Sequence, residues 1–303
     1  GSLLRFHRGA FELAIQLRQD ILPIVLCDTW MAMPRDAYWF EPYHTTVRAW
    51  PRVTPQTFDY SLGARALMRH CEQLVEASLQ AQLGQINTPR VLRRKVGRLY
   101  RYLGKFVEQF VYWKMKGDPL FHSLPAVVPR QGFILDLGCG YGVPAHWLSY
   151  DSDARTVLGV DYDEVKVRIA QRTAQGHARV EFQYQDILTW TYPACDVVLL
   201  LDVLHYWPPD VQAQILAKAF GALRPGGLLI LREAAREATA GHQRVERWEK
   251  FATRIGHNKA TRLYFQSIAE LTAAVRRAGF GECTLQEGGG RDSNVMVVAS
   301  RAG

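Results

Sequence analysis

The sequence predicts an α/β fold for residues 126–303, organised around a mostly parallel sheet. Three observations predict it. Apolar segments of strand length recur at regular spacing through this region. Several of these segments end at an acidic residue. The first segment runs into a loop with glycine at every second position, at Gly138, Gly140 and Gly142. A loop of this kind predicts a ligand site at the carboxyl ends of parallel strands.

The first strand and its loop lie in FILDLGCGYG, residues 133–142. Glycine permits positive φ and lets a ligand touch the backbone. VPAHWLSY follows as a helix, which completes a strand–glycine loop–helix unit of the nucleotide-binding kind. A dinucleotide fingerprint, G-x-G-x-x-G, would require glycine at position 143, where the chain has Val143.

The remaining strands follow in order. TVLGVDYDE is a second strand that ends in Asp161, and VEFQYQDI is a third that ends in Asp186 and Ile187. CDVVLLLDVLHYW is a fourth, ending at Asp202, and LRPGGLLILRE contains a turn and a fifth strand. A capping box at residues 267–270 opens a late helix. ECTLQ and NVMVVAS fit a closing antiparallel hairpin.

The G-x-G-x-G spacing, with an acid two residues before the first glycine, resembles motif I of class I S-adenosylmethionine-dependent methyltransferases. The later strands agree, so the resemblance covers residues 126–303. It implies a Rossmann-like seven-stranded methyltransferase sheet with a C-terminal antiparallel hairpin, and S-adenosyl-L-methionine as the cofactor. It also implies that Asp161 binds the ribose hydroxyls, that Asp186 meets the adenine amino group and that Ile187 packs on the ring. The expected cofactor-binding residues are Asp136, Gly138, Cys139, Gly140, Gly142, Asp161, Tyr162, Asp186, Ile187 and Asp202.

Methyl transfer is an in-line displacement that requires acceptor and methyl about 3–3.5 Å apart. A base helps only when the acceptor carries a proton. His205, Tyr206 and Glu233 follow the fourth and fifth strands and are the catalytic candidates. An imidazole exchanges protons near neutral pH, but His205 could instead pack beside the methionine end of the cofactor. Glu233 could instead pair with Arg232 or Arg236.

Residues 234–266 could form a helical lid that suits an aromatic or acyl-bearing acceptor, with Trp248, Phe251, His257 and Tyr264 lining a pocket. A solvated surface helix is the alternative. The predicted activity is therefore methyl transfer to a small-molecule, lipidic or aryl/acyl acceptor. Two alternatives stay open: a cofactor-binding but non-catalytic lipid- or partner-binding module, and a nicotinamide-dependent oxidoreductase.

Residues 1–130 account for the whole net charge of +8, and residues 131–303 are neutral overall. Residues 88–118 read as one amphipathic helix, which Thr88 starts and Gly117 ends. Nine Lys and Arg against one Glu lie within 90–116. The helix could pack its apolar stripe on the methyltransferase domain, or lie on an anionic membrane. Nucleic acid is the least favoured partner. The stripe comprises Leu92, Val96, Leu99, Leu103, Phe106, Phe110 and Trp113.

Residues 3–57 raise a second resemblance. LLRFHRGAFELAIQLRQDILPIVL, MPRDAYWFEP and TTVRAWPRVTP look like the C-terminal half of lysophosphatidate-type acyltransferases. The resemblance implies a small α/β acyltransferase remnant with Ile21–Leu26 as a buried strand. The reactive His and Asp of that family have no counterpart in this segment, so no acyl transfer is expected from it.

These interpretations divide the chain into a truncated acyltransferase-like segment (1–60), a helical linker or cap (61–125) and the methyltransferase domain (126–303). Five scattered cysteines without a C-x-x-C pair indicate a reducing compartment, with neither a metal site nor a disulfide framework. No apolar run approaches the length of a membrane span, about 20 residues. We therefore expect a cytoplasmic protein, with peripheral membrane contact through 90–116 and oligomerisation left open.

Overall fold

The computed structural model describes residues 6–27, 46–235, 263–287 and 294–302. The chain forms two compact units, residues 1–88 and 89–303, which are described separately. The sequence predicts three domains with boundaries after residues 60 and 125. The two compact units do not test those boundaries, which stay a prediction. Among the helices described, none is both long and apolar enough to cross a bilayer.

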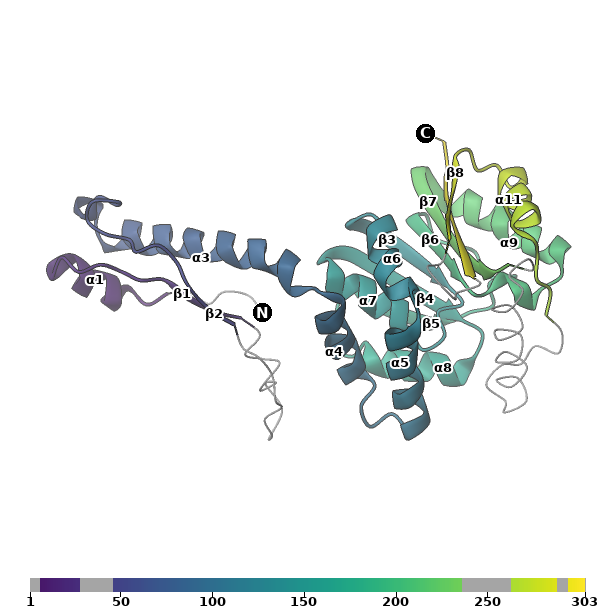
Figure 1. Cartoon of the computed structure of the whole chain (residues 1–303), viewed down its shortest axis with the longest axis horizontal. Coiled ribbons are helices and arrows are strands. Elements are labelled where there is room, and N and C mark those ends of the chain that lie inside the picture. The colour runs from purple at the N-terminus through teal and green to yellow at the C-terminus, as the bar shows by residue number, and fades with distance from the viewer. Residues whose placement is uncertain (1–5, 28–45, 236–262, 288–293, 303) are drawn as a thin grey trace. The chain divides into compact units, whose positions relative to one another are not determined.

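A seven-stranded sheet forms the centre of the second unit, in the order β5-β4-β3-β6-β7-β9-β8 (Figure 1). Its first five strands along the chain are parallel, and β9 and β8 close the sheet as an antiparallel hairpin. This confirms the expected methyltransferase sheet. The strands are β3 (Gln131–Leu137), β4 (Ala154–Asp161), β5 (Val180–Tyr184), β6 (Cys195–Leu201), β7 (Leu223–Ala234), β8 (Cys283–Glu287) and β9 (Asn294–Ser300).

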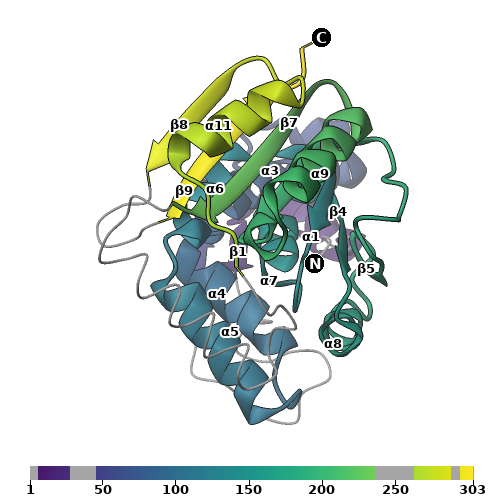
Figure 2. The ribbon, with the colours of Figure 1, turned by 90° about the vertical axis from the view of Figure 1, so that its right-hand side faces the viewer.

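Alternate residues of the central strands enter two different cores. Leu135 and Leu137 of β3 pack with α9 (Pro209–Ala222) and α11 (Ile268–Arg277) on one face. Ile134 of the same strand packs with α6 (Leu120–Val127), α7 (Val143–Asp151) and α8 (Glu164–Thr173) on the other face. Figure 2 shows α9 and α11 together on their face of the sheet. Helices cover both faces, so the parallel strands are apolar on both sides.

The late helix begins as expected. The Ser267 hydroxyl accepts the Glu270 amide, and the Glu270 carboxylate accepts the Ser267 amide, at 3.1 and 2.7 Å. This reciprocal pair is the predicted capping box. Gly279 follows the helix with φ 108°, a conformation that favours glycine.

The single helix predicted for residues 88–118 is wrong. The structure has α4 (Pro89–Leu99) and α5 (Lys105–Gly117), separated by a turn with positive φ at Tyr102 and Gly104. The turn shifts the helical phase, so the predicted stripe holds only in part. Leu103 and Phe110 still pack, partly buried, against the cluster that contains the stripe residues of α4. On α4, Leu92 and Val96 are buried with residues of α7, as expected for packing on the methyltransferase domain.

On α5 the buried residues are Val107, Val111 and Met115. The predicted stripe residues Phe106 and Trp113 lie instead on the outer side, 52% and 59% exposed. The spacing of apolar residues across a turn does not predict the buried face of both helices, because the turn changes which side of the second helix packs against the core.

The first unit contains α1 (Arg8–Gln16), β1 (Ile24–Cys27), β2 (Thr46–Ala49), a short 3-10 helix (Tyr60–Leu62) and α3 (Ala64–Ile86). Phe11, Val53 and Leu67 form its core with Cys71. The expected buried strand at Ile21–Leu26 is only half correct. Val25 is buried, but Ile24 and Leu26 are more than half exposed, because one face of the two-stranded β1–β2 sheet is open to solvent.

Candidate cofactor and acceptor site

The glycine loop joins β3 to α7 at the carboxyl edge of the sheet. Its amides at Gly138 and Cys139 donate to the Val160 carbonyl at 2.8 and 3.0 Å, which holds the loop against β4. All three glycines have positive φ, between 54° and 79°. The loop is therefore fixed in a shape that other residues rarely adopt.

The three glycines are required for different reasons. A Cβ at Gly138 would lie 2.5 Å from the Val203 side chain, and one at Gly142 would lie 2.2 Å from the Phe182 ring. A Cβ at Gly140 would meet no atom within 4 Å. The outer glycines are thus demanded by the protein's own packing, whereas Gly140 borders open space that a ligand can fill.

Asp161 lies at the end of β4, beside this open space. Its Oδ2 accepts the Gly140 amide and its Oδ1 accepts the Asp163 amide, both at 2.8 Å. Burial raises the pKa of Asp161. Each carboxylate oxygen keeps a second lone pair, so both can also accept a ligand hydroxyl. Tyr162, the next residue, is 40% exposed.

Asp136 lies near the end of β3, just before the loop, and is 1% exposed. Its Oδ2 has no hydrogen-bond partner among the residues that the structure describes. Burial, with the charge of Asp161 added, raises the pKa of Asp136 to about 7. A buried carboxyl oxygen without a partner is costly unless a ligand supplies a donor or a positive charge. This orphaned oxygen points to a cationic or hydrogen-bonding ligand.

The cysteine of the loop is not a reactive group. Burial raises the pKa of the Cys139 thiol well above its usual value, so it stays protonated and is not activated as a nucleophile. The loop therefore offers backbone and shape to a ligand, and no covalent chemistry.

Asp186 and Ile187 follow β5, as expected for an adenine site. Ile187 is buried, whereas Asp186 is exposed and its Oδ1 accepts the Leu188 amide at 2.9 Å. Lys218 of α9 holds this segment, which was not foreseen from the sequence. Its Nζ donates to the carbonyls of Ile187, Leu188 and Trp190 at 2.7–2.8 Å. No local signal marks Lys218, because its partners lie about 30 residues earlier in the chain.

Asp202 directly follows β6 and has φ 60°. Its Oδ2 lies 3.1 Å from Arg232 Nη1, and the same nitrogen donates to Asp118 at 2.9 Å. Lys114 Nζ is 3.9 Å from Asp202 Oδ2. Burial alone would raise the pKa of Asp118, but Lys114 and Arg232 hold it below its usual value. This ion cluster ties the end of α5 to β6 and β7; a cofactor role for Asp202 stays a prediction.

His205 and Glu233 form a buried pair at the same edge. His205 Nδ1 lies 2.6 Å from Glu233 Oε2. Glu233 Oε1 accepts the amides of Val203 and Leu204 at 2.8 and 2.5 Å. Both carboxylate oxygens are thus fixed, and Glu233 contacts His205. Of the arginines considered as alternatives, Arg232 contacts Asp118 and Asp202, and Arg236 lies outside the described residues. This geometry was not derivable from the sequence, since 28 residues separate the pair.

Aromatic rings surround the His205 imidazole. The Tyr206 and Phe265 rings lie 4.2 and 5.1 Å away between centroids. The Tyr264 amide donates to the His205 carbonyl at 2.7 Å. Most of the predicted lid, residues 236–262 with Trp248, Phe251 and His257, lies outside the described residues. The described end of it, at Tyr264 and Phe265, does reach His205.

Comparison with known proteins indicates a methyltransferase domain. Residues 134–227 match the family described as "Methyltransferase domain". The chain is 28% identical over 140 residues to a carboxy-S-adenosyl-L-methionine synthase from Wolinella succinogenes, covering 44% of this chain and 58% of that protein. It is 36% identical over 103 residues to a 27-O-demethylrifamycin SV methyltransferase from Amycolatopsis mediterranei, covering 32% and 37%. The chain thus spans less than two thirds of the length of these relatives.

Two solved structures share the fold. The apo form of the S-adenosylmethionine-dependent methyltransferase SibL has a TM-score of 0.54 at 24% identity, over 69% of this chain and 62% of that chain. The [4+2]-cyclase SpnF has a TM-score of 0.51 at 20% identity, over 63% and 82%. Because SpnF is a cyclase, the fold by itself does not prove methyl transfer.

The chain carries a class I S-adenosylmethionine-dependent methyltransferase domain. S-adenosyl-L-methionine is the cofactor of this domain class, and the residues present fit it. The cofactor carries an ammonium and a sulfonium, which suit the orphaned Asp136 oxygen, and ribose hydroxyls, which suit Asp161. The match sets aside the nicotinamide-dependent oxidoreductase considered from the sequence.

Proposed function

We propose that the chain transfers the methyl group of S-adenosyl-L-methionine to a hydroxyl oxygen of a small molecule, with His205 as the general base. The observation that carries the proposal is the buried contact of 2.6 Å between His205 and Glu233, at the edge of the sheet where the glycine loop also lies. A hydroxyl acceptor carries a proton, and a histidine paired with a carboxylate can take it.

The bound cofactor supplies a methyl carbon on a sulfonium that is open to displacement. The chain's own residues prepare the acceptor. Glu233 cannot rotate, because two backbone amides hold its other oxygen. It is placed to accept the Nδ1 proton of His205, which puts the lone pair on Nε2, a buried atom in this structure. In the proposed reaction Nε2 takes the hydroxyl proton. The carboxylate then stabilises the imidazolium that forms.

The surroundings of His205 favour an aromatic or acyl-bearing acceptor. Tyr206 and Phe265 provide flat apolar surfaces beside the imidazole. Glu233 acts through His205, so it is a positioning residue, and Tyr206 shapes the pocket. The name of the Amycolatopsis mediterranei relative supports an oxygen acceptor. These features favour lipidic or aryl/acyl hydroxyl compounds over compact polar acceptors.

The test uses the full chain, labelled methyl donor and a panel of hydroxyaryl, hydroxy-fatty and phospholipid acceptors. We expect transfer to at least one hydroxyl compound, and a loss of at least about 100-fold in kcat for His205→Gln with S-adenosylhomocysteine affinity retained. Transfer that His205→Gln leaves intact would overturn the base assignment. Cofactor binding with no transfer to any acceptor would favour the non-catalytic module instead.

We also propose that residues 3–57 descend from a lysophosphatidate-type acyltransferase. The β1–β2 pairing supports this, because Ile24–Cys27 of the expected strand pairs with Thr46–Ala49, part of the second arm of the expected hairpin. The first arm lies outside the described residues. Acyl transfer by this segment is not expected. An assay with acyl-coenzyme A and lysophosphatidate tests that expectation, and any turnover would contradict it.

A further inference from the structure

The outer face of α5 carries aromatic side chains in an exposed row. Phe106, Tyr112 and Trp113 are 52%, 45% and 59% exposed. Phe106 and Trp113 lie on the side away from the buried Val107, Val111 and Met115, and Tyr112 lies between the two sides. The outer side of the helix therefore carries apolar rings together with polar residues. Large aromatic residues grouped on a surface mark an interaction site more often than chance exposure.

Lysines frame this aromatic row. Lys105 begins the helix and Lys116 lies near its end, and both are exposed. Lys116 Nζ lies 5.1 Å from the Trp113 ring centroid and 5.6 Å from that of Tyr112. A lysine that lies over an aromatic ring at one end of the row gives the face both an apolar body and a cationic rim.

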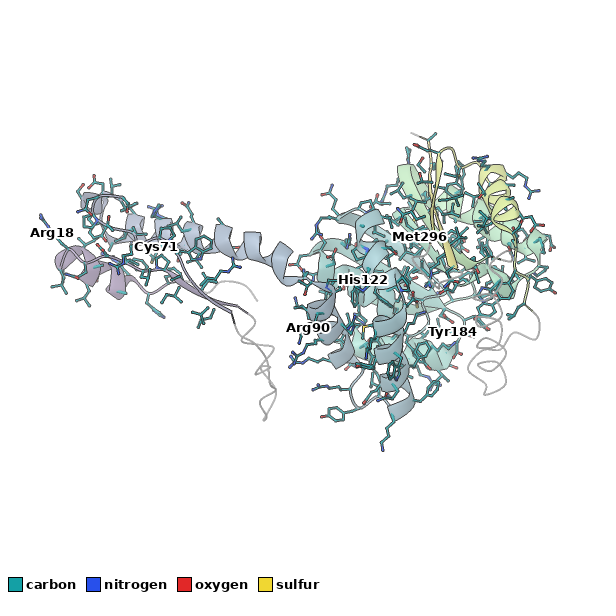
Figure 3. The ribbon with its side chains drawn as sticks, in the orientation of Figure 1. Arg18, Cys71, Arg90, His122, Tyr184 and Met296 are labelled. Carbon is teal, nitrogen blue, oxygen red and sulfur yellow. The ribbon has the colours of Figure 1, made fainter. Side chains whose placement is uncertain are left out.

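The turn before α5 extends the same surface. Tyr102 is 80% exposed at the α4–α5 turn. Its amide donates to Glu108 Oε1 at 2.5 Å, so the single acid of residues 90–116 is used to hold the turn. Of the basic residues of this segment, Lys105 and Lys116 are exposed beside the aromatic row, whereas Lys95 is buried and Lys114 pairs with Asp118. Arg90 at the start of α4 points outward from the helix (Figure 3).

We propose that the outer face of α5, together with the α4–α5 turn, binds the headgroup–acyl boundary of an anionic lipid membrane. Trp and Tyr favour this boundary, and lysine side chains reach from it to lipid phosphates. A helix of 13 residues with aromatic and basic groups on one side lies in the membrane surface and does not cross it.

Charge disfavours a second copy of the chain as the occupant of this face. A twofold dimer through α5 would bring Lys105 and Lys116 of one copy close to the same lysines of the other. Single-stranded nucleic acid shares the preference for basic and aromatic residues. However, the aromatic residues stand on one convex helix face and not in a groove that could follow a phosphate backbone. The lipid surface is therefore the better match.

The position of α5 connects the proposed membrane contact to the candidate active site. Asp118, directly after the helix, pairs with Arg232 of β7, and Lys114 lies close to Asp202 at the end of β6. The membrane-binding face is thus fixed to the carboxyl edge of the sheet, where His205 and the glycine loop lie. Membrane binding does not itself require the transfer reaction, and it can be tested without an acceptor.

The test is flotation of the full chain with vesicles of phosphatidylcholine alone and of phosphatidylcholine with about 30 mol% phosphatidylserine. We expect binding to the anionic vesicles, weakened at least about tenfold by Phe106→Gln/Trp113→Gln and by Lys105→Gln/Lys116→Gln. Val165→Gln is the matched control, because Val165 is 58% exposed on α8 and belongs neither to α5 nor to the α4–α5 turn. It should bind as the parent does. Unchanged thermal unfolding and an unchanged shift with S-adenosylhomocysteine show that each variant is folded.

Three outcomes would overturn the proposal. The first is no binding to anionic vesicles. The second is binding that survives Phe106→Gln/Trp113→Gln, which would assign it to another surface or to charge alone. The third is a single-stranded oligonucleotide that binds more tightly than the vesicles and competes with them. If Phe106→Gln/Trp113→Gln fails to fold, the single variant Trp113→Gln, which changes one exposed side chain, replaces it in the flotation assay. Weaker binding to anionic vesicles is again the expected result, and unchanged binding would overturn the proposal.

Discussion

Glu233 links His205 to the backbone that follows β6. One carboxylate oxygen lies 2.6 Å from His205 Nδ1, and the other accepts the Val203 and Leu204 amides. The carboxylate of Glu233 has an acceptor oxygen for His205 and another for the backbone amides. The side-chain amide of glutamine has only one acceptor oxygen. Glu233→Gln should therefore lower kcat at least about 100-fold and change the pH–rate profile. S-adenosylhomocysteine affinity, measured by calorimetry, should change little. An unaltered pH–rate profile would contradict the positioning role.

Asp161 and Asp163 offer a matched pair of carboxylates. Asp161→Ala removes the predicted ribose acceptor, and loss of two charge-assisted bonds, each about 1.5–3 kcal/mol, should weaken S-adenosylhomocysteine binding about 100-fold or more. Asp163 caps α8 by accepting the Val165 and Lys166 amides. Asp163→Ala should cost about 1 kcal/mol of stability and spare the affinity. Equal affinity losses in the two variants would refute the ribose assignment.

Gly140 and Gly142 should respond oppositely to alanine. Gly140→Ala meets open space, so the fold should lose only about 1–2 kcal/mol through its positive φ. Its Cβ occupies the ligand side, and cofactor affinity should fall at least about tenfold. Gly142→Ala drives a Cβ into the Phe182 ring, and it should lower stability by about 1–3 kcal/mol or more. Urea unfolding and calorimetry separate the two effects. Retained affinity in a folded Gly140→Ala protein would count against the loop as the binding site.

Asp136 should make the cofactor-free domain less stable as pH rises. Its folded-state pKa is about 7, against 3.8 for an ordinary aspartate. Between these values the unfolded chain has lost the proton and the folded chain keeps it, so stability falls by about 4 kcal/mol as pH rises through this window. Asp136→Asn should remove that slope and unfold later at about pH 8, while binding the cationic cofactor more weakly. Urea titrations at about pH 5 and pH 8 measure the difference, and parallel slopes would rule the assignment out.

Lys218 should govern recognition of the adenine ring through the segment that it holds. Lys218→Met removes three donors to the carbonyls of residues 187–190. We expect the preference for S-adenosylhomocysteine over its hypoxanthine analogue to fall at least about fivefold, because the segment that reads the ring edge loosens. A purely structural lysine would lower stability and leave that ratio unchanged.

The sequence determined the parts of this protein that depend on neighbours along the chain. Strand segments, the glycine loop and the acids at strand ends are local patterns, and the structure places them as expected, from Asp136 through Asp186. The capping box at Ser267 and Glu270 is confirmed for the same reason, since its two residues are only three positions apart.

Only the tertiary structure decided which distant groups meet. Strand β6 pairs with β7 so that Leu201 lies opposite Arg232, and this register brings His205 to Glu233 and Asp202 to Arg232. Lys218 contacts the carbonyls of residues 187–190 because α9 lies next to that segment in the fold. The turn at Gly104 reversed the chain within an apparently continuous helical pattern and turned Phe106 and Trp113 outward. Periodicity reports which residues share a face, but the direction of that face depends on packing between elements far apart in the sequence.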